Sequence, residues 1–151
     1  MKCIAFVVAL NLGLSVAARA DEPGLEYRLN AKDGRPFQWA NDSKEELLSP
    51  LPFMTSADFA SAVAKKSTNP NTPGAWEVEL THTAVGRTKF RAVADSDRNR
   101  EYCLLFRAMI WQCAAFPPIV KGVYDRGATI RHSLSRADAE KLAAEIRKKL
   151  R

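Results

Sequence analysis

The sequence predicts an α+β fold in which strands and helices follow one another along the chain. Three observations lead to this prediction. Residues 76–82 alternate between apolar and polar side chains, as a half-buried strand does. Residues 102–106 and 109–111 are two apolar runs on either side of a tight reversal, which indicates a hairpin. Residues 136–150 repeat apolar side chains at helical spacing, so an amphipathic helix closes the chain.

Residues 1–20 have the layout of a secretory signal peptide. Lys2 is a short positive start, residues 4–16 are mostly apolar, and residues 18–20 fit the small-x-small cleavage rule. The apolar stretch is too short and wrongly flanked for a membrane span. Cys3 stands at the start of that stretch and not at the cleavage point, which argues against a lipoprotein anchor. We therefore expect a soluble protein exported to the periplasm, with no membrane span.

The mature chain would be long enough for one domain with a real core, since 151 less 20 leaves 131 residues. The leader holds two of the 23 basic residues and none of the 17 acidic ones, so the net charge falls from +6 to +4. The remaining basic residues are dispersed and no recognition motif accompanies them. Nucleic-acid binding is therefore not expected.

Residues 21–53 are interpreted as an N-terminal extension that is partly strand. Residues 25–29 alternate like a strand, and residues 32–36 have turn chemistry. Phe37 and Trp39 follow the turn and would share one face of a second short strand.

The next predicted element is a helix over residues 55–66. Thr55 and Asp58 have the spacing of a capping box. Met54 and Phe59 are placed to form a hydrophobic staple across that cap.

A second helix is predicted after the 76–82 strand, with Thr83 as its cap and the polar run 95–100 at its end. Phe90 lies on its inner face, and Gly86 lies one turn before Phe90. A glycine lowers helix stability, so we expect this one to let the helix approach the sheet closely.

The hairpin turn has two alternatives. A two-residue turn at Arg107 and Ala108 requires positive φ from residues that are neither Gly, Asn nor Asp, which is strained. A three-residue loop that ends at Met109 is at least as favourable.

Turn length decides whether Cys103 and Cys113 can meet. With three loop residues they face one another; with two, Cys103 faces Gln112 and Cys113 points to the other face of the sheet. A disulfide between them would add about 2–3 kcal/mol in an oxidising compartment. Two buried free thiols are the alternative, and the spacing matches no metal or redox motif.

Ser135 is the predicted cap of the closing helix, and Asp138 follows in a pattern close to a capping box. Ala139, Leu142 and Ile146 share one face, with charged residues on the others. We expect a helix that covers the core. A membrane-surface helix is less favoured, because the apolar face is narrow and has no aromatic residue.

From Met54 onward, the order of motifs resembles the head subdomain of the first periplasmic region of SecD, the accessory membrane protein of the bacterial Sec translocase. The features that match are a Thr-x-x-Asp helix start, an Asn-Pro-Asn-Thr turn, an alternating strand, a Gly-x-x-x-Phe helix, a Pro-Ile loop, a Gly-x-x-Ile strand and an Ala-Glu-x-Leu-Ala helix. They lie at residues 55–58, 69–74, 76–80, 86–90, 118–119, 127–130 and 139–143.

The chain also departs from the family pattern. Arg107 and Ala108 stand where the family usually has Asp-Gly, and residues 114–117 are additional. SecD proper carries membrane helices, whereas none is predicted here. We therefore expect a free-standing, exported version of the head and not the translocase subunit itself.

The resemblance implies that residues 54–151 form a small, mostly antiparallel sheet with two or three helices packed on one face. It also implies a non-enzymatic module that binds protein or unfolded polypeptide, since the SecD head is thought to contact the emerging chain. The expected partner surface is the loop that carries Phe116, Pro117, Pro118 and Tyr124. Ordinary loop packing is the alternative for each of these residues.

Two other functions would each need particular residues of this sequence. A structural or self-associating envelope protein would use the hairpin or the strand edge near Trp76. An enzyme would need a pair such as Cys103 or Cys113 with one of the two histidines, His82 and His132. Cysteines inside apolar strands disfavour a thiolate, and nucleophile elbows, phosphate loops and metal motifs are missing from the sequence. We therefore expect no catalysis, cofactor or metal.

Overall fold

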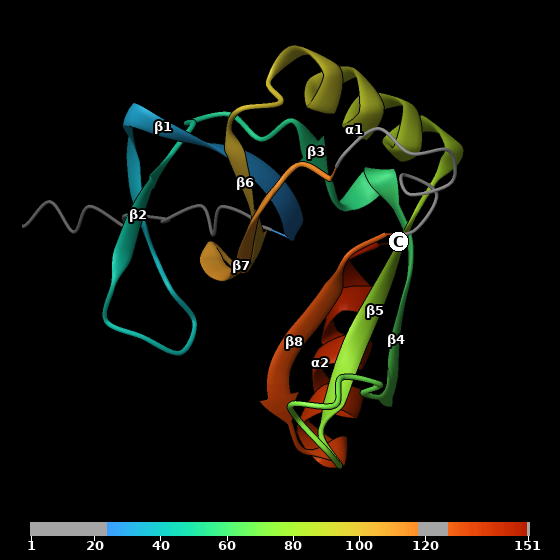
Figure 1. Ribbon diagram of the computed structural model, residues 1–151. Coiled ribbons are helices and arrows are strands. Elements are labelled where there is room, and N and C mark those ends of the chain that lie inside the picture. The colour runs from blue at the N-terminus through green and yellow to red at the C-terminus, as the bar shows by residue number, and fades with distance from the viewer. Residues whose placement is uncertain (1–23, 118–126, 151) are drawn as a thin grey trace, which may run out of the picture.

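The computed structural model describes residues 24–117 and 127–150. The leader predicted over residues 1–20 lies outside this part of the chain. The described residues form eight strands, a short 3₁₀ helix and two α-helices (Figure 1). In chain order these are β1 (Leu25–Gln38), β2 (Glu45–Leu48), β3 (Met54–Thr55), η1 (Ser56–Asp58), β4 (Phe59–Lys66), β5 (Trp76–His82), α1 (Ala84–Ser96), β6 (Glu101–Phe106), β7 (Met109–Ala115), β8 (Thr129–Leu134) and α2 (Arg136–Lys149).

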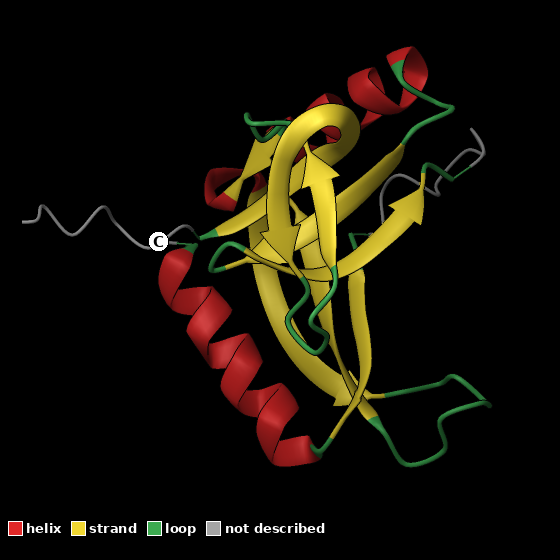
Figure 2. Cartoon of the chain, turned by 90° about the vertical axis from the view of Figure 1, so that its left-hand side faces the viewer, coloured by secondary structure: helices red, strands yellow, loops and turns green. Residues whose placement is uncertain are grey.

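The strands are divided between two antiparallel sheets. One has the order β2-β1-β6-β7, with β3 added beside β1, and the other has the order β4-β5-β8. Helix α2 lies along the second sheet (Figure 2), while α1 packs against β3, η1 and β5. The predicted α+β class, with mostly antiparallel strands and two helices, is confirmed. A single sheet is not formed, because β5 has a neighbour on both edges and the β6–β7 hairpin pairs with β1 instead. The strand edge near Trp76 is therefore already occupied.

Strand β1 runs through the stretch where a turn was expected. Its first part pairs with β6 and its last part with β2. Between these parts, Asn30 and Arg35 both lie opposite Leu48, so the residues between them form a bulge. The turn chemistry at residues 32–36 thus bends one long strand and does not reverse the chain.

The helix predicted over residues 55–66 is wrong. The Thr55 N–H does donate to the Asp58 carboxylate at 3.0 Å, but only the single turn η1 follows this contact. From Phe59 the chain is extended and pairs with β5 along the whole of β4. Three of the residues between 60 and 64 are alanines, which favour a helix by intrinsic propensity, so pairing with β5 overrides the local preference.

Both remaining helices begin at the predicted caps. Thr83 Oγ1 accepts from the Gly86 N–H at 3.0 Å, and Ser135 Oγ accepts from the Asp138 N–H at 3.1 Å. The close approach expected at Gly86 is made to η1, since an added Cβ would lie 2.1 Å from the Asp58 carbonyl oxygen.

The hairpin uses the strained two-residue turn. Arg107 and Ala108 have φ angles of 54° and 58°, and Phe106 lies opposite Met109. Both central residues therefore occupy the left-handed region that this turn requires.

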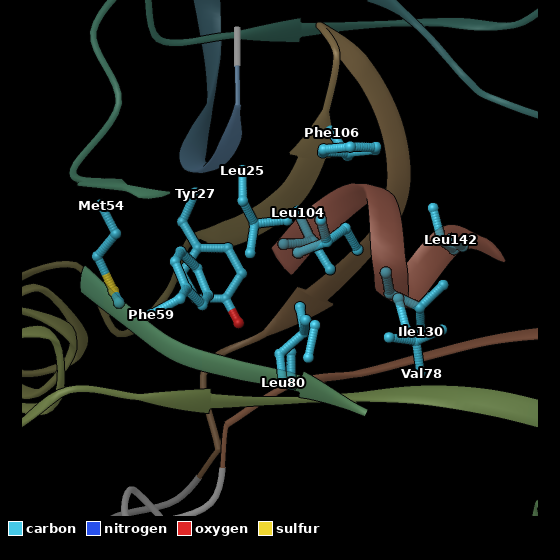
Figure 3. Packing of buried hydrophobic residues seen from close by; sticks show 14 of the residues in the cluster. Leu25, Tyr27, Met54, Phe59, Val78, Leu80, Leu104, Phe106, Ile130 and Leu142 are labelled. Atoms are coloured by element: carbon cyan, nitrogen blue, oxygen red, sulfur yellow. The ribbon is translucent and has the colours of Figure 1, made fainter. Parts of the chain in front are cut away.

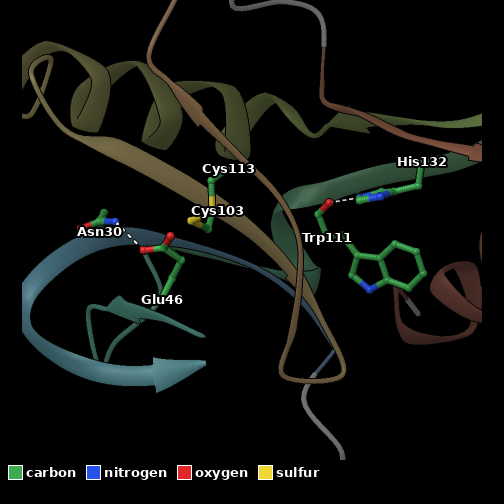
Figure 4. Close-up of a disulfide and its surroundings, with 6 residues drawn as sticks. All are labelled: Asn30, Glu46, Cys103, Trp111, Cys113 and His132. Atoms are coloured by element: carbon green, nitrogen blue, oxygen red, sulfur yellow. Dashed lines mark hydrogen bonds between the residues drawn. A yellow bond between two sulfur atoms is a disulfide. The ribbon is translucent and has the colours of Figure 1, made fainter. Parts of the chain in front are cut away.

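A bulge then restores the pairing that the longer loop would have produced. The register shifts between Leu104 and Leu105, which leaves Trp111 as the extra residue of β7. Because of this shift, Cys103 lies opposite Cys113, with their Cα atoms 4.0 Å apart and their sulfurs at bonding distance (Figure 4).

We expect a Cys103→Ala/Cys113→Ala variant to lose about 2–3 kcal/mol of unfolding free energy. The disulfide closes a loop in the unfolded chain and is packed against buried Leu48, Leu105 and Ile110. Urea denaturation of the wild type with and without reductant, beside the variant, measures this loss. The variant should not respond to reductant, and equal stability of oxidised and reduced wild type would contradict the prediction.

The two sheets share one core, in which Tyr27 is the central aromatic residue. Its ring centroid lies 5.1 Å from Phe59 and 5.2 Å from Tyr102. Figure 3 shows Tyr27 and Leu104 of the first sheet facing Leu80 of the second. Full burial raises the pKa of the Tyr27 hydroxyl well above 10.0. Strand β1, within residues 21–53, thus supplies a central part of the core.

Candidate binding groove between the two sheets

The predicted partner loop is described only at its first two residues. Phe116 is 6% exposed, and its ring stacks on Tyr102 with centroids 4.8 Å apart. A partner surface on this loop would need the Phe116 ring to be exposed, but the chain buries this ring in the aromatic core. Pro117 is partly buried. Pro118 and Tyr124 lie outside the described residues.

A groove of about 380 Å³ lies between the β6–β7 hairpin and α2. Its lining is mostly apolar and comes from both sheets and from α2. The lining residues are Asn41, Phe106, Arg107, Met109, Trp111, Leu134, Asp138, Lys141, Leu142 and Glu145.

The hairpin places two large side chains in this groove. Met109 follows the turn directly and is 39% exposed. Trp111 is the extra residue of the bulge, and bulges re-aim side chains in this way. The Trp111 indole N–H is enclosed and finds no hydrogen-bond partner among the described residues. An enclosed, unsatisfied donor is unfavourable, so this nitrogen lowers the local stability of the hairpin.

The α2 side adds Leu142 to the apolar floor and charged residues to the rim. Glu145 forms an ion pair with Arg107 of the hairpin turn at 3.1 Å, so the rim contact joins hairpin and helix. Asp138 and Lys141 also line the groove. Charges of both signs therefore surround an apolar floor, which gives the groove no strong preference for a charged ligand.

His132 of β8 connects the two sheets beside the groove (Figure 4). Its Nε2 is hydrogen-bonded to the Trp111 carbonyl oxygen, and its Nδ1 lies 3.1 Å from the Asn41 side-chain nitrogen. Its ring meets the Trp111 indole edge-on at 5.6 Å. With both ring nitrogens occupied, His132 has a structural role here.

Two further hollows are lined largely by polar and charged residues. One lies over the β4-β5-β8 sheet, where Glu77 is 3.6 Å from Lys65 and 3.7 Å from Arg131. The other lies beside β1, where Arg100 donates to the Asn30 carbonyl oxygen at 2.6 Å. Within residues 24–117 and 127–150, there is no cluster of three or more His, Cys, Asp or Glu residues that could hold a metal ion. No helix in the same ranges is long and apolar enough to cross a membrane.

Sequence reasoning did not find the groove. Trp111 was expected to be an ordinary hairpin residue and Leu142 an ordinary core residue. The available signal was a conflict at the hairpin: a two-residue turn and a Cys103–Cys113 pair are compatible only if one residue bulges out of β7.

No family model matches this sequence, and no curated protein matches it. Two of the solved structures with a similar fold are of SecDF. A crystal structure of SecDF in the super-membrane-facing form matches with a TM-score of 0.65 and 20% identity, over 83% of this chain and 19% of that one. A structure of SecDF, described as a membrane component that enhances protein export, matches with a TM-score of 0.61 and 21% identity, over 86% of this chain and 62% of that one.

The chain thus spans less than two thirds of either SecDF chain. At 20–21% identity the similarity shows the fold alone. The resemblance to SecD that the motif order predicted is therefore confirmed for the fold. The matched share is larger than residues 54–151, from which the motifs were drawn, so part of residues 1–53 also belongs to the similarity.

Proposed function

We propose that this chain is an exported, non-enzymatic module that binds polypeptide segments in the groove between the hairpin and α2. The observation that carries the proposal is the groove itself, which has an apolar floor that includes Met109 and Leu142 and charges of both signs on its rim. The fold shared with SecDF, a component that enhances protein export, supports the same conclusion.

The groove chemistry suits a polypeptide segment better than a small charged ligand. An apolar side chain on the floor would contribute about 25 cal/mol per Å² of surface removed from water. Because rim charges of both signs are present, segments of varied sequence would be accepted.

We place this function in the periplasm. The leader predicted over residues 1–20 supports export. The Cys103–Cys113 disulfide supports the same compartment, because disulfides persist where the environment is oxidising.

We expect Met109→Glu to weaken polypeptide binding by about tenfold or more. A carboxylate on the apolar floor would have to be desolvated by each bound segment. Binding is measured by fluorescence anisotropy with a labelled secretory polypeptide that cysteine alkylation keeps unfolded.

Val85→Glu is the matched control, since Val85 is 62% exposed on α1 and does not line the groove. It should bind like the wild type. Equal affinities of Met109→Glu and wild type would remove the groove as the site. A wild-type protein that binds no polypeptide but self-associates in sedimentation would favour the structural role instead.

A further inference from the structure

We infer that a bound polypeptide segment adds as an extra strand to the free edge of β7, held through its main chain. This inference rests on the function proposed above and names its binding mode. It concerns the backbone of Cys113 and Ala115, which lie beyond the part of β7 that enters the groove.

The pairing of β6 with β7 indicates which backbone groups face outward. Cys103 and Cys113 lie opposite one another with Cα atoms 4.0 Å apart. Such a short separation is typical of the non-hydrogen-bonded pair of an antiparallel ladder. The N–H and C=O of Cys113 therefore point away from β6. Ala115, two residues further and opposite Glu101, has the same orientation.

The outward backbone groups of Cys113 and Ala115 have no hydrogen-bond partner among the described residues. The outward carbonyl groups nearer the turn do accept hydrogen bonds. The Ala40 N–H donates to the Ile110 carbonyl oxygen at 2.8 Å, and His132 is bonded to the Trp111 carbonyl oxygen. No hydrogen bond from another described residue reaches the outward backbone groups of Cys113 or Ala115.

The other sheet edges are less suited to strand addition. On β4, the Ala62 carbonyl oxygen accepts from Arg147 at 2.8 Å. Strand β2 has four residues, and Glu45 and Glu46 are two of them. Strand β8 contains Ser133 with a φ of 49°, which breaks its extended conformation. Beyond its bulge, β7 combines free outward groups at Cys113 and Ala115 with an extended conformation.

The edge of β7 is also accessible and rigid. Ala114 and Ala115 have small side chains, and Ala115 is exposed. The disulfide ties Cys113 to the central part of the sheet, so little ordering is needed when a partner binds.

The occupant is an extended polypeptide, because only another extended backbone presents alternating acceptors and donors at the two-residue spacing of Cys113 and Ala115. Recognition through the main chain is independent of side-chain identity. Trp111 on the same strand then places the groove beside the added segment, where it receives one apolar side chain.

The test compares two substitutions at one position. Ala115→Pro removes the outward N–H and places a ring on the edge, but it breaks no bond to β6, because Ala115 belongs to a non-hydrogen-bonded pair. Ala115→Thr keeps the N–H in a residue that favours strands. The probes are the alkylated, unfolded polypeptide and a short synthetic peptide of alternating valine and threonine. Thermal unfolding of both variants verifies that they are folded.

We expect Ala115→Pro to weaken binding of both probes about tenfold or more, while Ala115→Thr binds like the wild type. Amide exchange of Cys113 and Ala115 in the wild type should slow at least about tenfold when the peptide is bound. Unchanged binding by Ala115→Pro, or unchanged exchange at these two amides, would overturn strand addition.

If the wild type binds and only Met109→Glu fails, the proposed function stands without this mode. If the wild type binds neither probe, both proposals fail. Should Ala115→Pro not fold, the amide-exchange result alone decides.

Discussion

Gly127→Ala is expected to lower the free energy of unfolding by about 3 kcal/mol. Gly127 lies just before β8, at the point where the chain crosses the backbone of β5. An added Cβ would lie 1.6 Å from the Leu80 carbonyl oxygen and 2.9 Å from the Thr81 Cα. Both contacts are with main-chain atoms of a central strand, so no side-chain rotation relieves them.

Relief of this clash would require β8 to move away from β5. The Leu80 N–H donates to the Ala128 carbonyl oxygen at 2.8 Å, and this bond would be lengthened. Ile130 is fully buried next to it and would lose packing. Thermal unfolding should show a midpoint lowered on the order of 10 °C.

Gly74→Ala is the control for the general cost of replacing a glycine. Gly74 has a φ of 80°, and nothing lies within 4 Å of a Cβ built on it. Its replacement should therefore cost about 1 kcal/mol, from backbone strain alone. If the two variants are equally stable, the close approach of Gly127 to β5 does not matter for folding.

Acidification from pH 6.5 to pH 4 is expected to cost up to about 3 kcal/mol of stability through His82 alone. His82 is 3% exposed at the end of β5, between the rings of Phe59 and Phe90. Burial, assisted by the positive charge of Arg87 and opposed by Asp58, lowers the pKa of His82 from 6.5 to about 4.

The sign follows from proton uptake. Between pH 6.5 and pH 4, the unfolded chain binds a proton at His82 that the folded chain excludes, so stability falls as the pH falls through this window. Well above pH 6.5 the imidazole is neutral in both states and the contribution is constant. Its Nε2 lies 3.3 Å from the Tyr27 hydroxyl, a contact that suits the neutral ring.

Urea denaturation at several pH values, with wild type and His82→Gln side by side, isolates this contribution. Glutamine is neutral at all these values and can still reach the Tyr27 hydroxyl, so His82→Gln should show a smaller loss on acidification. A His132→Gln variant removes the other histidine and should retain the decline due to His82. Parallel curves for wild type and His82→Gln would contradict the assignment.

The local sequence by itself determined several elements of this protein. The alternation from Trp76 to His82 predicted β5, and the Thr83 and Ser135 caps predicted both α-helices at the residues where they begin. The two apolar runs predicted the hairpin. These signals are carried by residues that neighbour one another in the chain, so no knowledge of distant partners was needed. Their order along the chain was also sufficient to indicate the fold shared with SecDF.

The tertiary structure decided the remainder, because those features depend on residues that are far apart in sequence. Residues 59–66 follow a helix cap, yet they form β4 because β5 offers an unpaired edge. Phe116 looks like a loop aromatic, yet it is buried because Tyr102 and Phe90 leave space for its ring in the core.

The groove required both kinds of information together. Arg107 and Ala108 adopt positive φ despite their local cost, and the register is then shifted by the bulge at Trp111. Strand pairing with β1 and the disulfide act across the whole hairpin, so their combined stabilisation exceeds the strain of two turn residues. That balance places Met109 and Trp111 opposite α2 and leaves the edge of β7 free, and it was not visible in the sequence.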